Sequence, residues 1–197
     1  TGREIESTLV KAVKANPNIT IFENHLAVDL LYRRVGGRKQ CCGAWVYDVR
    51  VLQLFRVLAG ITLLATGGSG QVYLHTTNPR IATGDGIAMA YRAGARVANL
   101  EFMQFHPTAL FHPEGEAFLI SEAVRGEGGR LRLRNGRRFM PDYHQRAELA
   151  TRDVVARAID REIKLSGQSC VYLDLTHLKD SFLRQRFPNI YSRLKNL

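Results

Sequence analysis

The sequence predicts an α/β fold followed by an α+β block within a chain of 197 residues. An amphipathic helical pattern at 3–15 precedes several β-rich segments, and a continuous apolar run at 61–66 ends in a glycine loop. Such a run is typical of a buried strand in an α/β protein. After about Leu100 helical patterns alternate with short β segments, so we expect a domain boundary there.

The first elements follow from periodicity and turn residues. The helix at 3–15 places Ile5, Leu9 and Val13 on one face and ends at Asn16-Pro17. Turn signals then separate β-rich segments that predict a mostly antiparallel sheet, at 19–22, 25–32, 43–49 and 51–58. Thr83-Gly84-Asp85-Gly86 opens a helix that runs to about Ala95.

The second half of the chain combines helices with short strands. A strand is expected at 97–105, and Pro107 holds His106 in an extended conformation. Asn135-Gly136 predicts a β-hairpin that carries exposed arginines. Helices are expected at 116–124, 151–164 and 177–186, with a strand at 170–173.

The net charge of +10 and the pI near 9.9 raise the question of an anionic partner. The basic residues gather at 33–39 and 130–138, without interleaved aromatic residues and without a nucleic-acid motif. We therefore expect solvated hairpin faces, or charges that face an absent segment, and no nucleic acid.

Three cysteines, of which Cys41 and Cys42 are adjacent, favour a reducing, cytoplasmic setting, and no metal-binding spacing is present. The longest apolar run, 51–65, contains Gln53 and Arg56 and is shorter than the roughly 20 residues that span a bilayer. No membrane span is expected.

Four chemically distinct side chains occur between residues 99 and 152. They are the imidazole of His106, the hydroxyl of Ser121, the carboxylate of Glu122 and the guanidinium of Arg152. Such a set can bind a small dicarboxylate, although a single histidine is more often a core residue. Arg152 stands at a helix start, where the helix dipole disfavours a cation, and this hints at function.

Ser121 and Arg125 lie at i and i+4 of the expected helix, so they share a face from which Glu122 turns aside. The alternative is a surface ion pair between Glu122 and Arg125, which would contribute only ~0.3 kcal/mol.

A second candidate site combines Thr66, Gly67 and Gly68 with Asp85. Glycine amides next to a helix start suit a flat cofactor with a polar tail. Two alternatives stay open, because glycine loops after strands are often plain turns and Asp85 could simply cap the helix.

Together these motifs resemble the succinate dehydrogenase and fumarate reductase flavoprotein family over nearly the whole chain. The resemblance rests on Thr1-Gly2-Arg3-Glu4, Ala65-Thr66-Gly67-Gly68, Thr77-Asn78-Pro79, Thr83-Gly84-Asp85-Gly86, Phe105-His106-Pro107-Thr108 and Arg152-Asp153. The branch that oxidises L-aspartate is suggested by Asn99-Leu100-Glu101-Phe102, Thr108-Ala109-Leu110, Arg138-Phe139-Met140-Pro141-Asp142 and Leu173-Asp174-Leu175-Thr176-His177.

The resemblance implies that residues 1–100 are part of a Rossmann-like FAD-binding domain with an antiparallel sheet, and that 101–197 form an α+β capping domain. It implies FAD contacts at Asp85, Thr66, Gly67 and Gly68. It also implies a dicarboxylate pocket that contains His106, Ser121 and Glu122, where the family has threonine in place of Ser121. The implied reaction removes two electrons from L-aspartate and yields iminoaspartate for NAD biosynthesis.

The resemblance gives Arg152 a proton-transfer role at the substrate Cα. A guanidinium pKa above ~12 makes electrostatic stabilisation the safer assignment.

The dinucleotide-binding turn and the C-terminal helical domain of the family are absent from the sequence, which predicts an internal fragment, inactive alone. Quinolinate synthase is an implied partner, and an unpaired sheet edge predicts self-association. Two alternatives stay open: a flavoprotein subunit that acts on succinate or fumarate, and a non-catalytic basic binding module.

Overall fold

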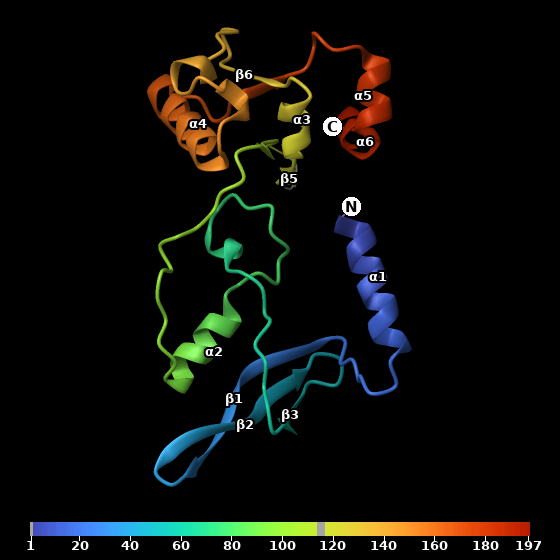
Figure 1. Ribbon diagram of the computed structural model, residues 1–197, viewed down its shortest axis with the longest axis vertical. Helices are drawn as coiled ribbons and strands as arrows, with labels where there is room; N and C mark the ends of the chain where they lie inside the picture. The colour runs from blue at the N-terminus through green and yellow to red at the C-terminus, as the bar shows by residue number, and fades with distance from the viewer. Residues whose placement is uncertain (1, 114–116) are drawn as a thin grey trace. The chain divides into compact units, whose positions relative to one another are not determined.

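A computed structural model describes residues 2–113 and 117–197 (Figure 1). The chain divides into two compact units that interleave in sequence. The first contains 1–67 and 84–97, and the second contains 68–83 and 98–197.

The first unit is built on a three-stranded antiparallel sheet. It follows helix α1 (Gly2–Ala15) and consists of β1 (His25–Val35), β2 (Arg38–Asp48) and β3 (Gln53–Leu58), in the order β1-β2-β3. Gly36 and Gly37 have φ of 55° and 78°, as the tight turn between β1 and β2 requires. The predictions of the first helix and of an antiparallel sheet are confirmed.

Helix α2 (Asp85–Ala93) belongs to the same unit, and its predicted start at the Thr-Gly-Asp-Gly turn is confirmed. An ion pair links it to the sheet, because Arg92 Nε of α2 donates to Asp29 Oδ2 of β1 at 2.8 Å. Arg92 Nη2 also donates to the carbonyl of Val28 at 3.2 Å.

Two predicted strands of this unit are wrong. Residues 19–22 and 61–66 are irregular, and Ile61 and Leu63 are 92% and 86% exposed. A buried strand needs backbone partners on its edges, and the three-stranded sheet provides none for these residues. Their β propensity is real, but propensity alone does not form a strand.

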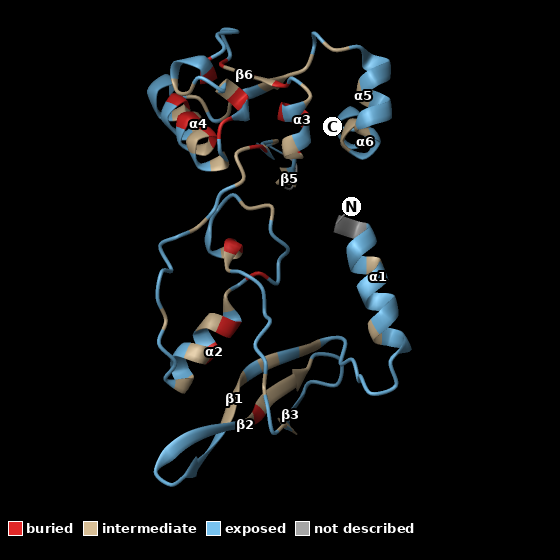
Figure 2. Cartoon of the chain, viewed as in Figure 1, coloured by how far each residue is buried: buried red, intermediate tan, exposed pale blue. Residues whose placement is uncertain are grey.

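The second unit packs short strands and helices around one apolar cluster, which Figure 2 shows as buried positions near α4 and β6. Its helices and 3₁₀ turns are η1 (Gly70–Val72), α3 (Glu122–Gly126), η2 (Met140–Asp142), η3 (Ala147–Leu149), α4 (Arg152–Ser166), α5 (Asp180–Arg186) and α6 (Pro188–Lys195). Its strands are β4 (Ala109–Leu110), β5 (Phe118–Leu119), β6 (Arg130–Arg132) and β7 (Tyr172–Asp174), with β4 antiparallel to β5 and β6 antiparallel to β7. The cluster consists of Leu131, Leu133, Phe139, Met140, Ala150, Val155 and Ala158.

Several predictions for this unit need correction. Residues 97–105 form no strand, and the helix predicted at 116–124 begins only at Glu122, because 118–119 pair with β4 instead. Glu116 itself lies outside the described residues. The predicted arginine hairpin is reduced to one bridge between Arg132 and Arg138. The predicted helix at 151–164 is confirmed as α4.

The hairpin arginines are not simply solvated, as the sequence had suggested. Arg132 pairs with Asp174 at 2.7 Å, and Arg138 pairs with Glu148 at 2.5 Å. Arg137 contacts both Asp142 and Glu162 at 2.8 Å. Carboxylates of the same unit therefore compensate these charges.

In the part of the chain that the structure describes, no helix is long and apolar enough to cross a membrane. The same residues contain no group of three side chains that could hold a metal ion. All three cysteines are free thiols.

Candidate active site

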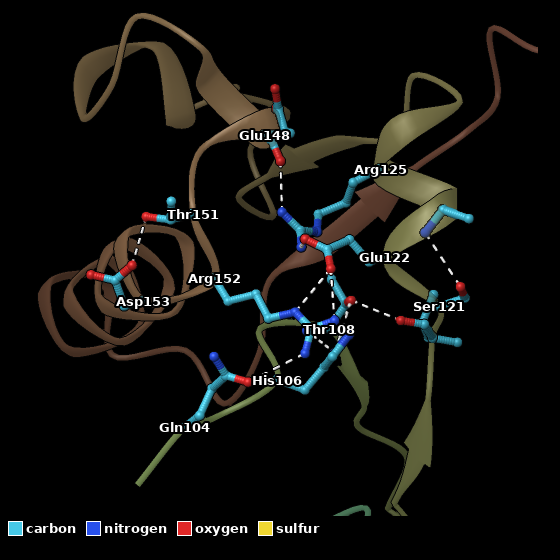
Figure 3. A network of polar contacts seen from close by, with 12 residues as sticks. Gln104, His106, Thr108, Ser121, Glu122, Arg125, Glu148, Thr151, Arg152 and Asp153 are labelled. Carbon is cyan, nitrogen blue, oxygen red and sulfur yellow. Dashed lines mark hydrogen bonds and ion pairs between the residues drawn. The ribbon is translucent and has the colours of Figure 1, made fainter. Parts of the chain in front are cut away.

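A carboxylate between two arginines forms the centre of the polar group in the second unit (Figure 3). Glu122 Oε2 accepts from Nε and Nη2 of Arg152, both at 2.8 Å, and Glu122 Oε1 accepts from Arg125 Nη2 at 2.9 Å. Gln104 Oε1 accepts a longer bond from Arg152 Nη1 at 3.4 Å. The structure therefore brings the predicted residues Glu122 and Arg152 together.

The N-cap residues Ser121 and Thr151 explain where the helices that carry Glu122 and Arg152 begin. Ser121 is the N-cap of α3, where its hydroxyl accepts from the amide of Ala123 at 3.3 Å. Thr151 is the N-cap of α4 and donates to Asp153 Oδ1 at 2.6 Å, so Arg152 is the first residue of the helix. A cation at this end gains nothing from the helix dipole. Its side chain instead reaches back to Glu122.

The hydroxyl of Ser121 can act both as a hydrogen-bond acceptor and as a donor. Its oxygen caps α3 as an acceptor, and its O–H can still donate to a ligand. The predicted shared face of Ser121 and Arg125 is wrong, because Ser121 lies outside the helix and Arg125 pairs with Glu122 instead.

His106 lies half-buried beside this cluster (Figure 3). Its Nδ1 accepts from the amide of Thr108 at 3.3 Å, whereas the Thr108 hydroxyl donates to the carbonyl of Ile120 at 2.9 Å. In neutral imidazole, an accepting Nδ1 leaves the proton on Nε2. His106 can therefore donate one hydrogen bond from Nε2.

Two titratable groups in this cluster are shifted from their ordinary values. Burial, followed by the nearby charges of Arg152 and Arg125, lowers the pKa of His106. The hydrogen bond from Arg152 is the main cause that lowers the pKa of Glu122. Near neutral pH the site therefore combines a neutral imidazole, an ionised carboxylate and two guanidinium groups.

Arg125, which was not among the site residues predicted from the sequence, is only 2% exposed. Its Nη1 donates to the carbonyl of Glu148 at 2.6 Å, and its Nη2 donates to Glu122. The sequence carried no signal of this burial, because helical spacing does not show that Arg125 points into the core. The surface ion pair considered from the sequence thus exists, but its cation is buried.

His106 also lines a cavity of about 1070 Å³. Its lining is mostly apolar and includes Phe105, Leu131, Phe187 and Tyr191. Glu122 and Arg152 do not line it. A dicarboxylate needs polar partners on most of its surface, so this cavity does not suit one.

Three of the candidate cofactor residues, Thr66, Gly67 and Asp85, belong to the first unit, which contains the start of α2. A Cβ added to Gly86 would lie 1.9 Å from Thr66 Oγ1, so the helix start meets the chain at Thr66 closely. Gly67 and Gly84 have φ of 71° and 82°. Gly68 is the first residue of the second unit and is exposed.

These residues fit the polar portion of FAD. No side chain caps α2, whose N-cap is Gly84, so its first amides can face an anionic group. Asp85 is the exposed first residue of the helix and supplies an acceptor for hydroxyl groups. The Thr66 hydroxyl lies against the same turn.

Comparison with known proteins assigns the chain to one family. The family model described as "FAD binding domain" matches residues 1–197. L-aspartate oxidase 1 of Ralstonia nicotianae is 55% identical, and the match covers 100% of this chain but 37% of that protein. L-aspartate oxidase of Vibrio cholerae is 50% identical with the same coverage. The chloroplastic L-aspartate oxidase of Arabidopsis thaliana is 48% identical over 98% of the chain and 31% of that protein.

Solved structures agree with this relationship. A mutant of E. coli quinol fumarate reductase FrdA matches with a TM-score of 0.82 and 33% identity, over 93% of this chain and 33% of that one. Sdh1 of Mycobacterium smegmatis matches with a TM-score of 0.70 and 33% identity, over 97% and 32%. The predicted resemblance and FAD as the cofactor are thereby confirmed. The chain belongs to the FAD binding domain family, among the flavoproteins related to succinate dehydrogenase, fumarate reductase and L-aspartate oxidase.

Proposed function

We propose that a full-length protein containing this chain oxidises L-aspartate to iminoaspartate. The observation that carries the proposal is the fixed guanidinium of Arg152 beside a neutral imidazole, in a chain 55% identical to an L-aspartate oxidase. FAD, when bound, supplies the acceptor for the two electrons. The chain supplies substrate binding and orientation.

In this proposal the substrate carboxylates meet three donors. His106 donates from Nε2, Ser121 donates from its hydroxyl, and Arg152 contributes its charge. Arg152 also attracts and orients the substrate carboxylates while hydride leaves Cα for the flavin, a role that needs no loss of its own proton. Glu122 already uses both oxygens on arginines, so it orients Arg152 and leaves direct contact with the substrate to the other three.

Thr66, Gly67, Gly68 and Asp85 are the residues that we assign to FAD. We assign residues 1–100 to the FAD-binding domain and 101–197 to the capping domain over the substrate. The assignment is supported by the places of Thr66, Gly67 and Asp85 in the first unit and of the polar group around Arg152 in the second unit.

The proposal also covers the cellular compartment, the partner protein and self-association. The three free thiols support a reducing compartment such as the cytoplasm, although the Arabidopsis relative is named chloroplastic. Quinolinate synthase is proposed as the acceptor of the product, for NAD biosynthesis. Self-association through the edge of the three-stranded sheet is proposed because such edges pair readily.

The second candidate is oxidation of succinate or reduction of fumarate. The TM-score of 0.82 to fumarate reductase favours this candidate. The residues around Arg152 would also suit any four-carbon dicarboxylate. A basic binding module is disfavoured, since ion pairs within the unit compensate the arginines at 132, 137 and 138.

Anaerobic mixing of the full-length flavoprotein with L-aspartate or with succinate distinguishes the two candidates. Bleaching of the flavin by L-aspartate alone supports the oxidase, and bleaching by succinate alone assigns the chain to the second candidate. Salt-sensitive DNA binding without any effect of dicarboxylates would identify a binding module.

A further inference from the structure

Two buried carboxylates in the second unit pair with adjacent arginines. Glu148 and Glu162 are 3% and 5% exposed, and they pair with Arg138 and Arg137 respectively. Each pair thus joins a buried carboxylate to an arginine. The two pairs differ in the residues that the backbone carbonyls of Glu148 and Glu162 contact.

The carboxylate of Glu148 has all its contacts away from the candidate active site. Oε1 accepts from the amide of Leu131 at 3.0 Å and from Arg138 Nε at 2.9 Å, and Oε2 accepts from Arg138 Nη2 at 2.5 Å. The bond from Leu131 links η3, which carries Glu148, to β6, and the two-pronged contact with Arg138 fixes the orientation of the carboxylate.

The carbonyl of the same residue points the other way, toward Arg125 (Figure 3). It accepts from Arg125 Nη1 at 2.6 Å. Arg125 Nη2 holds Glu122, and Glu122 in turn holds Arg152. Arg125 Nε has no partner among the described residues, so Arg125 is held through Glu122 and through the Glu148 carbonyl.

We propose that Arg138 and Glu148 are positioning residues for the candidate active site: their ion pair fixes the Glu148 carbonyl, which aligns Arg125, Glu122 and Arg152. The inference rests on the proposed function for its kinetic consequences. Its structural part concerns only the contacts among these five residues.

The second pair is the natural control. Glu162 lies inside α4 and accepts from Arg137 Nη2 at 2.8 Å and from the Tyr143 hydroxyl at 2.9 Å. Its carbonyl accepts from the Ser166 hydroxyl at 2.6 Å. None of these partners contacts Glu122, Arg125 or Arg152 through a hydrogen bond that the described residues show.

The experiment compares four variants of the full-length protein loaded with FAD. Glu148→Gln and Arg138→Lys break the two-pronged contact. The glutamine amide would place an N–H group against an N–H group of Arg138, and a lysine ammonium cannot donate two parallel hydrogen bonds as the guanidinium does. Glu162→Gln and Arg137→Lys make the same changes in the control pair. We expect Glu148→Gln to lower kcat on the order of tenfold to hundredfold, with a smaller effect on KM. The control variants lose thermal stability to a similar extent but keep kcat.

The pH profile gives a readout that a general loss of stability would not change. Glu122 faces Arg125 on α3, Arg152 on α4 and His106 from the segment before β4. If Arg125 moves away, the ionised form of Glu122 loses one of its cations, so its pKa rises. The acidic limb of the kcat profile then moves to higher pH in Glu148→Gln and stays in place in Glu162→Gln.

Crystal structures of Glu148→Gln and Glu162→Gln separate this inference from the proposed function. A wild-type protein that does not act on L-aspartate overturns the function, yet the structures still show whether Arg125 leaves Glu122 only in Glu148→Gln. An unmoved Arg125 in Glu148→Gln overturns the inference. Equal losses of kcat in Glu148→Gln and Glu162→Gln overturn it as well.

Discussion

Arg152 and Glu122 stand 30 positions apart in sequence and share two contacts of 2.8 Å through one carboxylate oxygen. The contact turns an arginine at the unfavourable end of α4 into a fixed cation. The other oxygen of Glu122 is held by the buried Arg125.

Arg152→Lys should lower kcat/KM for L-aspartate on the order of 10²-fold to 10³-fold, because an ammonium cannot reproduce the geometry of the guanidinium. Anaerobic flavin reduction by L-aspartate measures the effect. Arg157→Lys is the matched control, since Arg157 lies on the same helix and its ion pair among the described residues is with the exposed Asp153. Equal rates for Arg152→Lys and Arg157→Lys would remove Arg152 from the site.

His106 should titrate below its ordinary pKa of 6.5, with burial as the main cause and Arg152 as the second. In Arg152→Gln the pKa of His106 should rise but stay below that value, because burial remains. Nuclear magnetic resonance of labelled histidine follows both titrations. A midpoint in Arg152→Gln no higher than in the wild type would contradict the assigned charge effect.

The lowered pKa of His106 also has a consequence for stability. Since the folded state binds the proton less readily than the unfolded state, this contribution is complete above pH 6.5 and is lost as pH falls toward the folded pKa. Urea midpoints across this window should fall less in His106→Gln than in the wild type. Parallel curves would count against a neutral, half-buried imidazole.

Gly86→Ala should impair both folding and FAD retention, because the added Cβ would meet Thr66 Oγ1 at 1.9 Å. We expect a cost of about 1–3 kcal/mol, as for other overpacked sites. Gly60→Ala is the control, since no atom lies within 4 Å of its Cβ position. Adding Thr66→Ala to Gly86→Ala should restore part of the stability but not the Thr66 contact with FAD. Full FAD retention in Gly86→Ala would argue against the close approach.

Asp174 should contribute to acid stability. Hydrogen bonds from the amide and hydroxyl of Thr176, and then from Arg132, lower its pKa from 3.8 to about 2. Its contribution, on the order of 1–2 kcal/mol, is present above pH 3.8 and is lost as pH falls toward 2. Asp174→Asn should therefore destabilise at neutral pH and match the wild type near pH 2. Asp160→Asn, which breaks only the exposed pair with Lys164, should change little.

The helices with regular apolar spacing were predictable from the sequence, whereas strands that depend on a neighbouring strand were not. Helices α1 and α4 follow from their apolar spacing and from the residues at their ends. Residues 61–66 and 97–105 have strong β propensity but no strand beside them in the described chain. Propensity describes the residue, whereas a strand requires a neighbour.

The candidate site shows the same limit. The residue types and the turns around them indicated His106, Ser121, Glu122 and Arg152, and the structure gathers His106, Glu122 and Arg152 into one polar cluster. The role of Glu148 was not predictable, because its contact with Arg125 uses a backbone carbonyl, which every residue has. Helical spacing also could not show that Arg125 points into the core.

The central claim is that this site breaks the Cα–H bond of L-aspartate. Its most direct test is rapid anaerobic mixing of the full-length flavoprotein with L-aspartate and with L-aspartate deuterated at Cα. We expect both substrates to bleach the flavin and the deuterated one to do so several-fold more slowly. A flavin that L-aspartate leaves oxidised would contradict it.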